Sequence, residues 1–442
     1  GTLTYNSRTT SVGTTQTGPE SGPLNDPTAM LYVRSSDLDA TGHLLPGVPI
    51  EPLVLRAAAG DCIQLTLANK LGTTTPPDLP GYSTFPMIVN DFNANQVHPS
   101  YFAGLHPELL AMNLEDSDGF QIGQNNTQVI QPTDKPITYT WYAGHLSLDA
   151  SLNLVATPVE FGAVNLMPAD IFKQGSKGAV GAMVIEPQGS TWVEDTTTRA
   201  QATVTKADGT SFRDFVLITQ NDVNLRYASG DPVASLAAED DPEDTGHVGY
   251  NYRTEPHWFR MGYPPETPLT GMNDFGEPIT SSLFTKDIDF TNVLSNAQVG
   301  GDPQTPIFTA KAGTPIRLRL LHPVGKQRNN IFQLHGHVWE EEPYTTTAIP
   351  QGGTVSGMTI LGTPVVGSTV IADQPLSTNL FVNNPFSEWQ GSQMGVGPSS
   401  HFDIIPANGA GGNFKVPGDY LYRTHQPSQF DNGMWGLLRV TP

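Results

Sequence analysis

Hydrophobic and polar positions alternate in short runs along most of this chain, and helical periodicity is nearly absent. Residues with β-branched or aromatic side chains gather in short stretches that are separated by clusters of Gly, Pro, Asn and Asp. This pattern is typical of strands joined by turns in a sandwich or barrel. The sequence therefore predicts an all-β fold, with the clearest strands at 52–56, 63–67, 137–141, 182–186 and 214–219.

Landmarks in the first half of the chain recur in the same order in the second half, which indicates an internal repeat. The matched pairs are 59–67 with 312–320, Leu105-His106 with Leu334-His335, 137–142 with 418–422, and 178–185 with 433–440. We therefore predict two related β domains. The expected division is a polar N-terminal extension at 1–30, a first domain at 31–204 and a second domain at 205–442.

Composition and charge narrow the possible partners. The 43 acidic and 22 basic side chains give a net charge of -21, which argues against nucleic acid or an anionic membrane as partner. Divalent cations are the ions that such an acidic surface would attract. No apolar stretch is long enough to span a membrane. The chain begins Gly-Thr-Leu without a Met, so we expect a processed form or part of a longer protein.

The single cysteine, Cys62, excludes an intrachain disulfide. It lies in a predicted strand, and we expect a small buried or half-buried side chain there.

Among the histidines, His335 and His337 have the spacing that carries chemistry. Residues two apart on a strand point to the same face, so two imidazoles in this arrangement can converge on one metal. Imidazole suits copper, zinc, iron and nickel. The alternative is that both histidines are structural, held by hydrogen bonds.

Three segments give the chain a resemblance to the multicopper oxidases: Phe332–Trp339, Tyr420–Val440 and Lys177–Pro187. They resemble the histidine motif of the last domain, the C-terminal copper segment and the end of the first domain. The sequence is most similar to the long bacterial members linked to manganese oxidation. The resemblance implies two cupredoxin-like Greek-key β-sandwich domains and an extracytoplasmic location, extracellular, periplasmic or at the cell surface.

The resemblance also places the copper ligands, and most of them are absent. The family's type 1 copper is bound by a cysteine thiolate, two histidines and an axial methionine. The corresponding positions here hold Thr424, Gln429 and Met434, with the remaining histidine lost near Asn330. Without the thiolate no blue copper forms, so we expect the type 1 site to be lost.

The trinuclear copper cluster of the family requires His-x-His pairs, and these are also broken. One pair becomes Gln333 and His335, and another becomes Arg423 and His425. In the first domain only His106 remains, paired with either Gly104 or Glu108, and the segment 160–164 contains no histidine. An arginine stays charged at neutral pH and repels a copper ion beside it.

Three interpretations of the surviving histidines follow. In the first, His106, His335 and His425 bind one copper or zinc ion, with Glu108 or water completing the shell. In the second, which we favour, no cofactor is bound, Arg423 pairs with Glu108 or Glu160, and His337 packs and donates to a backbone carbonyl. In the third, the chain is one part of a larger oxidase.

The functional expectation is a multicopper-oxidase-like protein that acts as a scaffold, assembly or interaction module, with no catalytic residue assigned. The alternative is a copper-dependent oxidase of manganese or phenolic substrates, or part of one, completed by partner chains or further sequence. We expect a protein partner or self-assembly, for which residues 1–30 are a candidate strand donor.

Overall fold

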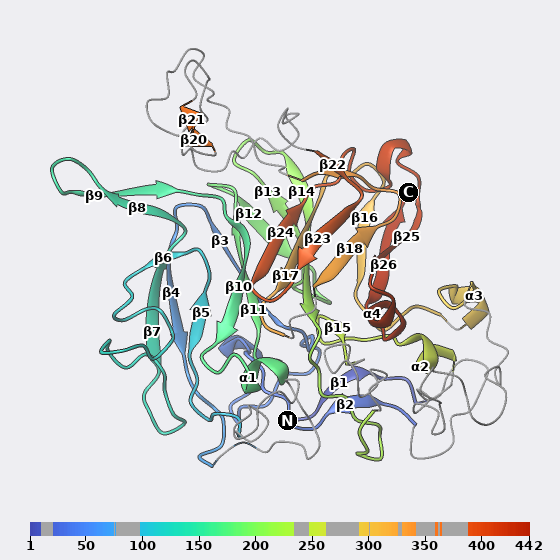
Figure 1. Ribbon diagram of the computed structural model, residues 1–442, viewed down its shortest axis with the longest axis horizontal. Coiled ribbons are helices and arrows are strands. Elements are labelled where there is room, and N and C mark those ends of the chain that lie inside the picture. Colours follow the sequence, from blue (N-terminus) through green and yellow to red (C-terminus); the bar gives the residue numbers. More distant parts are fainter. Residues whose placement is uncertain are drawn as a thin grey trace.

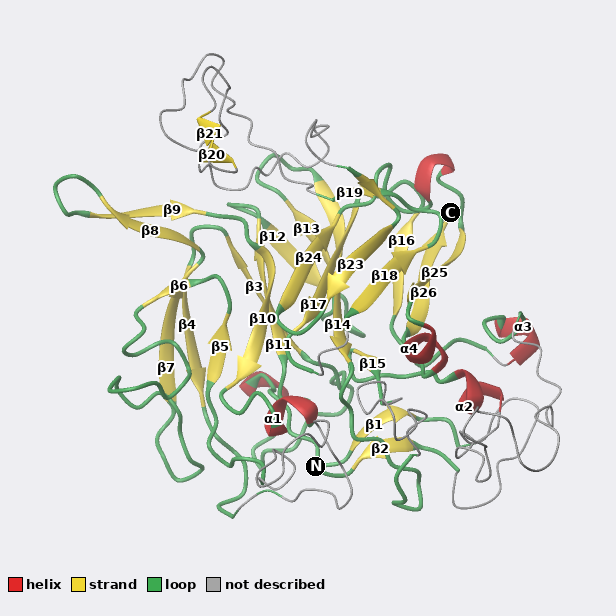
Figure 2. Ribbon diagram, viewed as in Figure 1, coloured by secondary structure: helices red, strands yellow, loops and turns green. Residues whose placement is uncertain are grey.

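The computed structural model describes residues 1–9, 21–74, 76, 98–233, 247–261, 291–299, 301–325, 329–341, 359–360, 363–364 and 388–442. The predicted loops at 234–249 and 352–367 lie mostly outside these ranges, and Glu342 lies outside them. Strands dominate the described chain, as Figure 2 shows. The helices are short: η1 (Ser35–Asp37), α1 (Lys173–Ser176), α2 (His257–Met261), α3 (Asn296–Val299), η4 (Gly412–Phe414) and α4 (Pro427–Asp431). The predicted all-β class is confirmed.

The first half of the chain forms a sandwich of two sheets (Figure 1). One sheet has the order β3 (Leu53–Ala58), β11 (Gly181–Glu186), β10 (Gly162–Pro168), β5 (Leu105–Pro107). The other has the order β4 (Cys62–Leu67), β7 (Ile137–Tyr142), β6 (Ala111–Met112). The two sheets enclose a core that includes Tyr139, Trp141, Val164 and Ile185.

The second half forms a larger sandwich of the same kind. One sheet contains β12 (Thr191–Glu194), β13 (Gln201–Thr205), β14 (Ser211–Gln220), β17 (Ile316–His322) and β24 (Ser400–Ile404), with β15 (Gly249–Tyr250) paired to β14. The facing sheet has the order β16 (Ile307–Lys311), β26 (Trp435–Thr441), β25 (Gly418–Thr424), β18 (Asn330–Leu334), β23 (Ser392–Val396). Two small pairs complete it: β19 (Trp339–Glu340) with β22 (Trp389–Gln390), and β20 (Thr359–Ile360) with β21 (Thr363–Pro364).

The strands on either side of residue 204 belong to one sheet. The predicted domain boundary falls at the end of β13, which pairs with β14, whereas the sheet changes between β11 and β12. The division at residues 204 and 205 therefore stays a prediction.

The N-terminal stretch lies between the two sandwiches. β1 (Leu3–Asn6) pairs with β2 (Leu24–Asp26), and Leu3, Tyr5 and Leu24 are buried. The cluster that surrounds them contains apolar side chains from both sandwiches, including Val184 and Val216. β1 pairs with β2 of its own chain, and the role of residues 1–30 as a strand donor to a neighbour stays a prediction.

The internal repeat is visible in the strand order. In the first sandwich β3 runs parallel to β11, followed by β10 and β5; in the second, β16 runs parallel to β26, followed by β25 and β18. Leu105-His106 thus lies on β5, and Leu334 ends the equivalent strand β18 with His335 directly after it. The match of 137–142 with 418–422 is wrong. In the first sandwich β10 lies beside β11, and in the second sandwich β25 lies beside the equivalent strand β26. The strand that corresponds to β25 is therefore β10, and not β7, which contains 137–142. Both segments are alternating strands that end in aromatic residues, which is why the sequence pattern misled.

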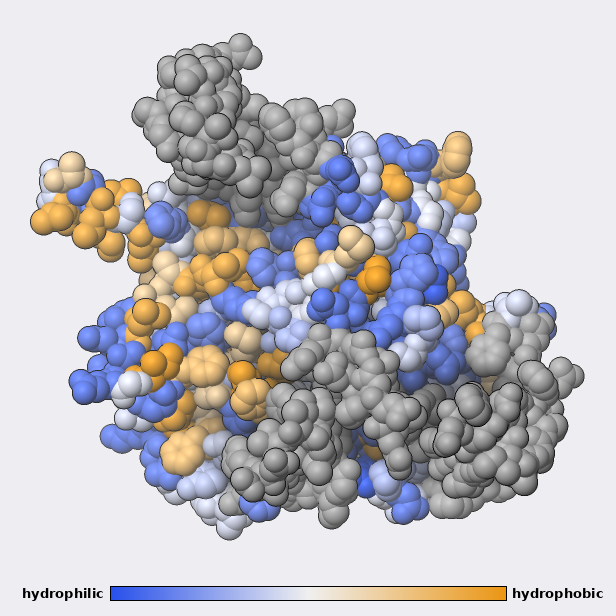
Figure 3. Space-filling model, in the orientation of Figure 1, coloured by the Kyte–Doolittle hydropathy of each residue, from blue (hydrophilic) through white to orange (hydrophobic). Residues whose placement is uncertain are grey.

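A hairpin projects from the first sandwich. β8 (Gly144–Leu148) and β9 (Leu154–Pro158) pair only with each other among the described strands. Leu148, Leu152 and Leu154 near its tip are exposed, and Figure 3 shows apolar side chains on the hairpin among polar ones. Asp149 organises the turn by accepting hydrogen bonds from the backbone N–H groups of Ser151 and Asn153.

Candidate functional site

The residues that the resemblance places at the type 1 copper positions are buried in the second sandwich. Thr424, at the end of β25, is fully buried, and its Oγ1 donates to Oε1 of Gln429 at 3.5 Å. The Thr424 N–H donates to the Met434 carbonyl, and the Met434 N–H donates to the Gln429 carbonyl. Asn330 is buried and donates to the Val396 carbonyl.

This donor set does not fit a type 1 copper. It offers a hydroxyl, two amides and a thioether, whereas that copper requires a thiolate and imidazoles. Cys62 cannot supply the thiolate, because it lies on β4 of the other sandwich. The expectation that Cys62 is buried or half-buried is wrong: its side chain is exposed. Along β4 the apolar residues at alternate positions turn toward the core, and Cys62 lies on the opposite face.

His335 and His337 diverge instead of converging on one point. β18 ends at Leu334, and Gly336 adopts a φ of 70°, so the strand alternation assumed for the pair does not apply. His335 is exposed, whereas His337 is buried.

His337 is a packing residue. Its Nδ1 lies 2.9 Å from the His335 carbonyl oxygen, and its Nε2 accepts the Gly411 N–H at 3.1 Å. These partners require a neutral ring with the proton on Nδ1. Burial lowers the pKa of His337, which favours the same neutral form. The predicted donation to a backbone carbonyl is therefore confirmed.

The remaining cluster positions of the second sandwich share one face of the β18–β25 pair. Gln333 lies directly opposite Arg423, and the neighbouring core positions Phe332, Leu334 and Tyr422 point the other way into the core. The backbone pairing continues one residue beyond each strand, because the His335 N–H donates to the Leu421 carbonyl and the His425 N–H donates to the Ile331 carbonyl, so both histidines lie on the same face as Gln333 and Arg423. Burial lowers the pKa of His335, and the nearby Arg423 and His425 lower it further.

Arg423 does not have the acid partners predicted for it. Glu160 pairs with Arg317 at 2.5 Å. Glu108 accepts hydrogen bonds from Asn165 and from the Ser399 hydroxyl. The guanidinium of Arg423 instead lies over the Phe430 ring of α4, 4.7 Å from its centroid.

His106 belongs to a different environment. On β5 of the first sandwich, its Nδ1 lies 2.7 Å from the carbonyl oxygen of Asp118 and 3.3 Å from its carboxylate. Its ring packs edge-on against Phe120.

The residues present fit a bound metal poorly. Within the described ranges, no group of three or more His, Cys, Asp and Glu side chains is placed to hold a metal ion. His335 and His425 come together, but the cation beside them is Arg423, whose charge opposes a metal. The site of His106, His335 and His425 stays a prediction.

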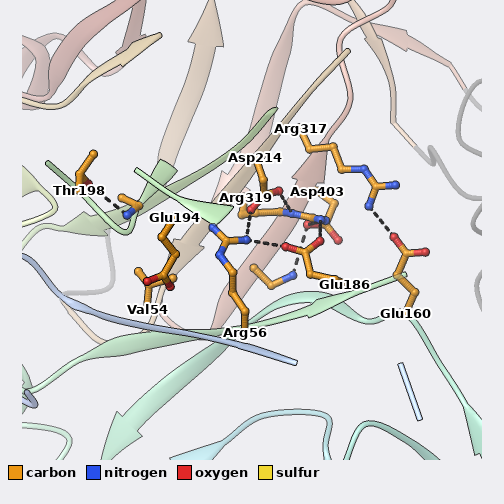
Figure 4. Close-up of polar contacts among 12 residues, drawn as sticks. Val54, Arg56, Glu160, Glu186, Glu194, Thr198, Asp214, Arg317, Arg319 and Asp403 are labelled. Atoms are coloured by element: carbon orange, nitrogen blue, oxygen red, sulfur yellow. Dashed lines mark hydrogen bonds and ion pairs between the residues drawn. The ribbon is translucent and has the colours of Figure 1, made fainter. Parts of the chain in front are cut away.

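A buried charge network joins the two sandwiches, and sequence reasoning did not anticipate it (Figure 4). Arg319 of β17 contacts Asp214 of β14 at 2.7 Å, Asp403 of β24 at 2.7 Å and Glu186 of β11 at 3.3 Å. Arg56 of β3 reaches Glu186 at 2.5 Å and Asp214 at 2.6 Å. The side chains of these ion pairs are nearly or fully buried, so water screens them little.

Burial and the surrounding charges shift the pKa values of these carboxyls in opposite directions. Burial and the charge of Asp214 raise the pKa of Glu186 to about 7, against the pull of Arg319 and Arg56. Burial also acts on Asp214, but Arg319 and Arg56 outweigh it and lower the pKa of that carboxyl. Burial raises the pKa of Glu160 despite Arg317.

The sequence signal for this network is an alternation of charged and apolar residues in β17, Ile316-Arg317-Leu318-Arg319-Leu320. Taken alone, that pattern indicates a solvated face. The arginines are buried because strands of the first sandwich pack against them.

Comparisons with known proteins give similarity at the level of structure. No family model and no curated protein matches the chain. A multicopper oxidase structure matches with a TM-score of 0.41 and 14% identity, covering 89% of this chain and 79% of that chain. The blue copper oxidase from Nitrosomonas europaea matches with a TM-score of 0.40 and 12% identity, covering 93% of this chain and 83% of that one.

A copper nitrite reductase from the same organism matches with a TM-score of 0.39 and 12% identity, covering 89% of this chain and 84% of that chain. At these identities and scores, no activity or residue role passes from the neighbours to this chain. Among the described residues, the helices are all too short and too polar to cross a membrane.

Proposed function

We propose that this chain is an extracytoplasmic, multicopper-oxidase-like protein that has no type 1 copper and acts as a scaffold or interaction module. One observation carries the proposal: the type 1 positions Thr424, Gln429 and Asn330 hold buried side chains that hydrogen-bond within the protein. Hydroxyl and amide side chains at these positions leave no thiolate or imidazole to receive electrons from a substrate.

Two further features support a structural role. The network around Arg319 ties the sandwiches together through fully buried ion pairs, which resist separation because an unpaired buried charge is costly. The exposed leucines of the β8–β9 hairpin give the chain an apolar projection suited to contact with a protein partner or a second copy.

The test measures metal and activity on one sample of purified protein. Metal content by mass spectrometry, visible absorption and oxygen consumption with Mn²⁺ or a phenol would be recorded before and after incubation with copper. We expect no thiolate-to-copper absorption and no oxygen consumption. Copper that is retained stoichiometrically together with that absorption would overturn the proposal.

The alternative is a copper-dependent oxidase, or part of one, and the proximity of His335 and His425 is the observation that favours it. It predicts one copper or zinc per chain that is lost in His335→Ala. The matched control is His145→Ala, which removes an exposed histidine on the β8–β9 hairpin. Equal metal content in both variants would exclude a site at His335.

A further inference from the structure

The guanidinium of Arg423 has no hydrogen-bond or ion-pair partner among the described residues. Its side chain is half-buried, and its Nε is buried without an acceptor. The arginines of the interdomain network behave differently: Arg56, Arg317 and Arg319 each contact one or more carboxylates. A guanidinium keeps its charge and its five donors at any physiological pH. Leaving such a donor buried and unused costs free energy.

Other polar groups lie around Arg423, and among the described residues no carboxylate contacts its guanidinium. Gln333 lies opposite it across the β18–β25 pair, and the buried Oε1 of Gln333 also has no partner among the described residues. Rotation of that side-chain amide would present its NH₂ group in place of the oxygen. The imidazoles of His335 and His425 lie on the same face and are exposed, so their N–H groups can reach a ligand from solvent.

Packing holds the guanidinium in place from one side. Phe430 of α4 stacks against Arg423, which limits the motion of its planar fork. Asp431, the acidic residue next to Phe430, is paired with His257 at 3.3 Å. In a chain with a net charge of -21, this face therefore presents a fixed cation whose neighbouring acid, Asp431, contacts His257.

We propose that Gln333, His335, Arg423 and His425 form a binding site for an oxyanion, the carboxylate or phosphate group of a small ligand or of a partner. The planar fork of arginine matches both groups bidentately, and charge-assisted hydrogen bonds to them are short and strong. The site is independent of the scaffold role proposed above, since it requires neither a metal nor a partner chain.

The test is a titration at constant ionic strength in chloride with EDTA present, so that metal binding does not contribute. Sodium phosphate and sodium acetate are added in separate arms, and binding is followed by calorimetry and by the imidazole signals of histidine-labelled protein. We expect saturable binding of at least one anion, with shifts at His335 and His425. The arm with the tighter binding identifies the phosphate or the carboxylate as the preferred group.

Matched variants assign the binding to this face. Arg423→Gln should weaken binding by about tenfold or more, because the charge-assisted bonds are lost. Arg423→Lys keeps the charge without the fork and should weaken it less. The control is Arg439→Gln in the adjacent strand β26, where the same charge is removed from a guanidinium that already pairs with Asp302 and Asp419.

Three results would overturn the inference: no saturation with either anion, unchanged binding in Arg423→Gln, or an equal loss in Arg439→Gln. If Arg423→Gln does not fold, the Arg423→Lys variant and the histidine shifts of the unmodified protein still decide the question. Copper retained in the separate metal analysis would contradict the scaffold proposal and leave this titration unaffected.

Discussion

Arg319→Met tests whether the buried charge network holds the two sandwiches together. Methionine has a similar length but no charge, so the substitution leaves Asp214, Asp403 and Glu186 without their shared partner. All three carboxylates are at most 5% exposed. Water therefore cannot replace the lost contacts without opening the interface.

The magnitude follows from the geometry. Each ion pair at this spacing is worth about 4 kcal/mol at an effective dielectric constant of about 20. The variant also avoids the cost of burying a charged guanidinium, and this offsets the lost ion pairs by several kcal/mol. The expected net loss in the free energy of unfolding is about 3–5 kcal/mol near pH 7.5, the range for a buried pair that loses one partner.

The loss should shrink as the pH falls. Arg319 is one of the charges that lower the pKa of Glu186, so without it the folded pKa of that carboxyl lies further above its ordinary value of 4.5, and the native state binds more protons than the unfolded state between those two values. Stability of the variant therefore rises as pH decreases through that window. Urea denaturation at pH 5.5 and 7.5, followed by fluorescence and circular dichroism, measures both effects.

The control is Arg439→Met on β26, whose guanidinium pairs with Asp302 at 2.7 Å and with Asp419 at 2.8 Å on the surface. An exposed or partly exposed pair contributes about 1 kcal/mol or less. A loss below about 1 kcal/mol in Arg319→Met, or a loss equal to that of the control, would refute the reasoning.

Three further predictions concern the same network and the position that the resemblance gives to the type 1 copper. The folded pKa of Glu186 is about 7 and its ordinary value is 4.5, so the native state binds a proton that the unfolded state has lost between these pH values. The free energy of unfolding of the unmodified protein should therefore fall by up to ~3 kcal/mol as pH rises from 4.5 to above 7. Glu186→Gln should flatten that part of the plot of stability against pH, and an unchanged slope would contradict the prediction. Gly162→Ala should lower the free energy of unfolding by about 2 kcal/mol or more, because a Cβ at this φ of 70° would lie 1.5 Å from the Asp403 carboxylate. The control Gly42→Ala, at a φ of 86° in open space, should show only the smaller backbone cost when both variants are compared by thermal denaturation. Thr424→Cys should give no thiolate-to-copper absorption after copper addition, since Gln429 and Asn330 replace the imidazoles; appearance of that band would show that the site accepts copper.

The strands and their repeat were readable from the sequence. The run 63–67 alternates apolar and polar residues, and the run 182–186 is apolar up to its last residue. Clusters of Gly and Pro between such runs mark the turns. The Ala-Gly pairs at 59–60 and 312–313 recur because both turns require a residue with positive φ between two strands. The absence of a thiolate at Thr424 was equally plain, since it depends only on residue identity.

The match of 137–142 with 418–422 shows where the pattern stops being informative. Both segments have the alternation of a half-buried strand, but that property does not say which strand lies beside which. Only the pairing of β10 with β11 and of β25 with β26 decides the equivalence.

The tertiary structure alone decided the environment of each charged residue. Arg319 and Arg423 both lie on strands of the second sandwich next to apolar core residues, yet Arg319 is buried among carboxylates and Arg423 lies on a half-open face with no carboxylate contact among the described residues. The reason is physical: local sequence determines which side of a strand a residue faces, but the charge and polarity that it meets there come from segments distant in sequence, such as Glu186 and Asp403.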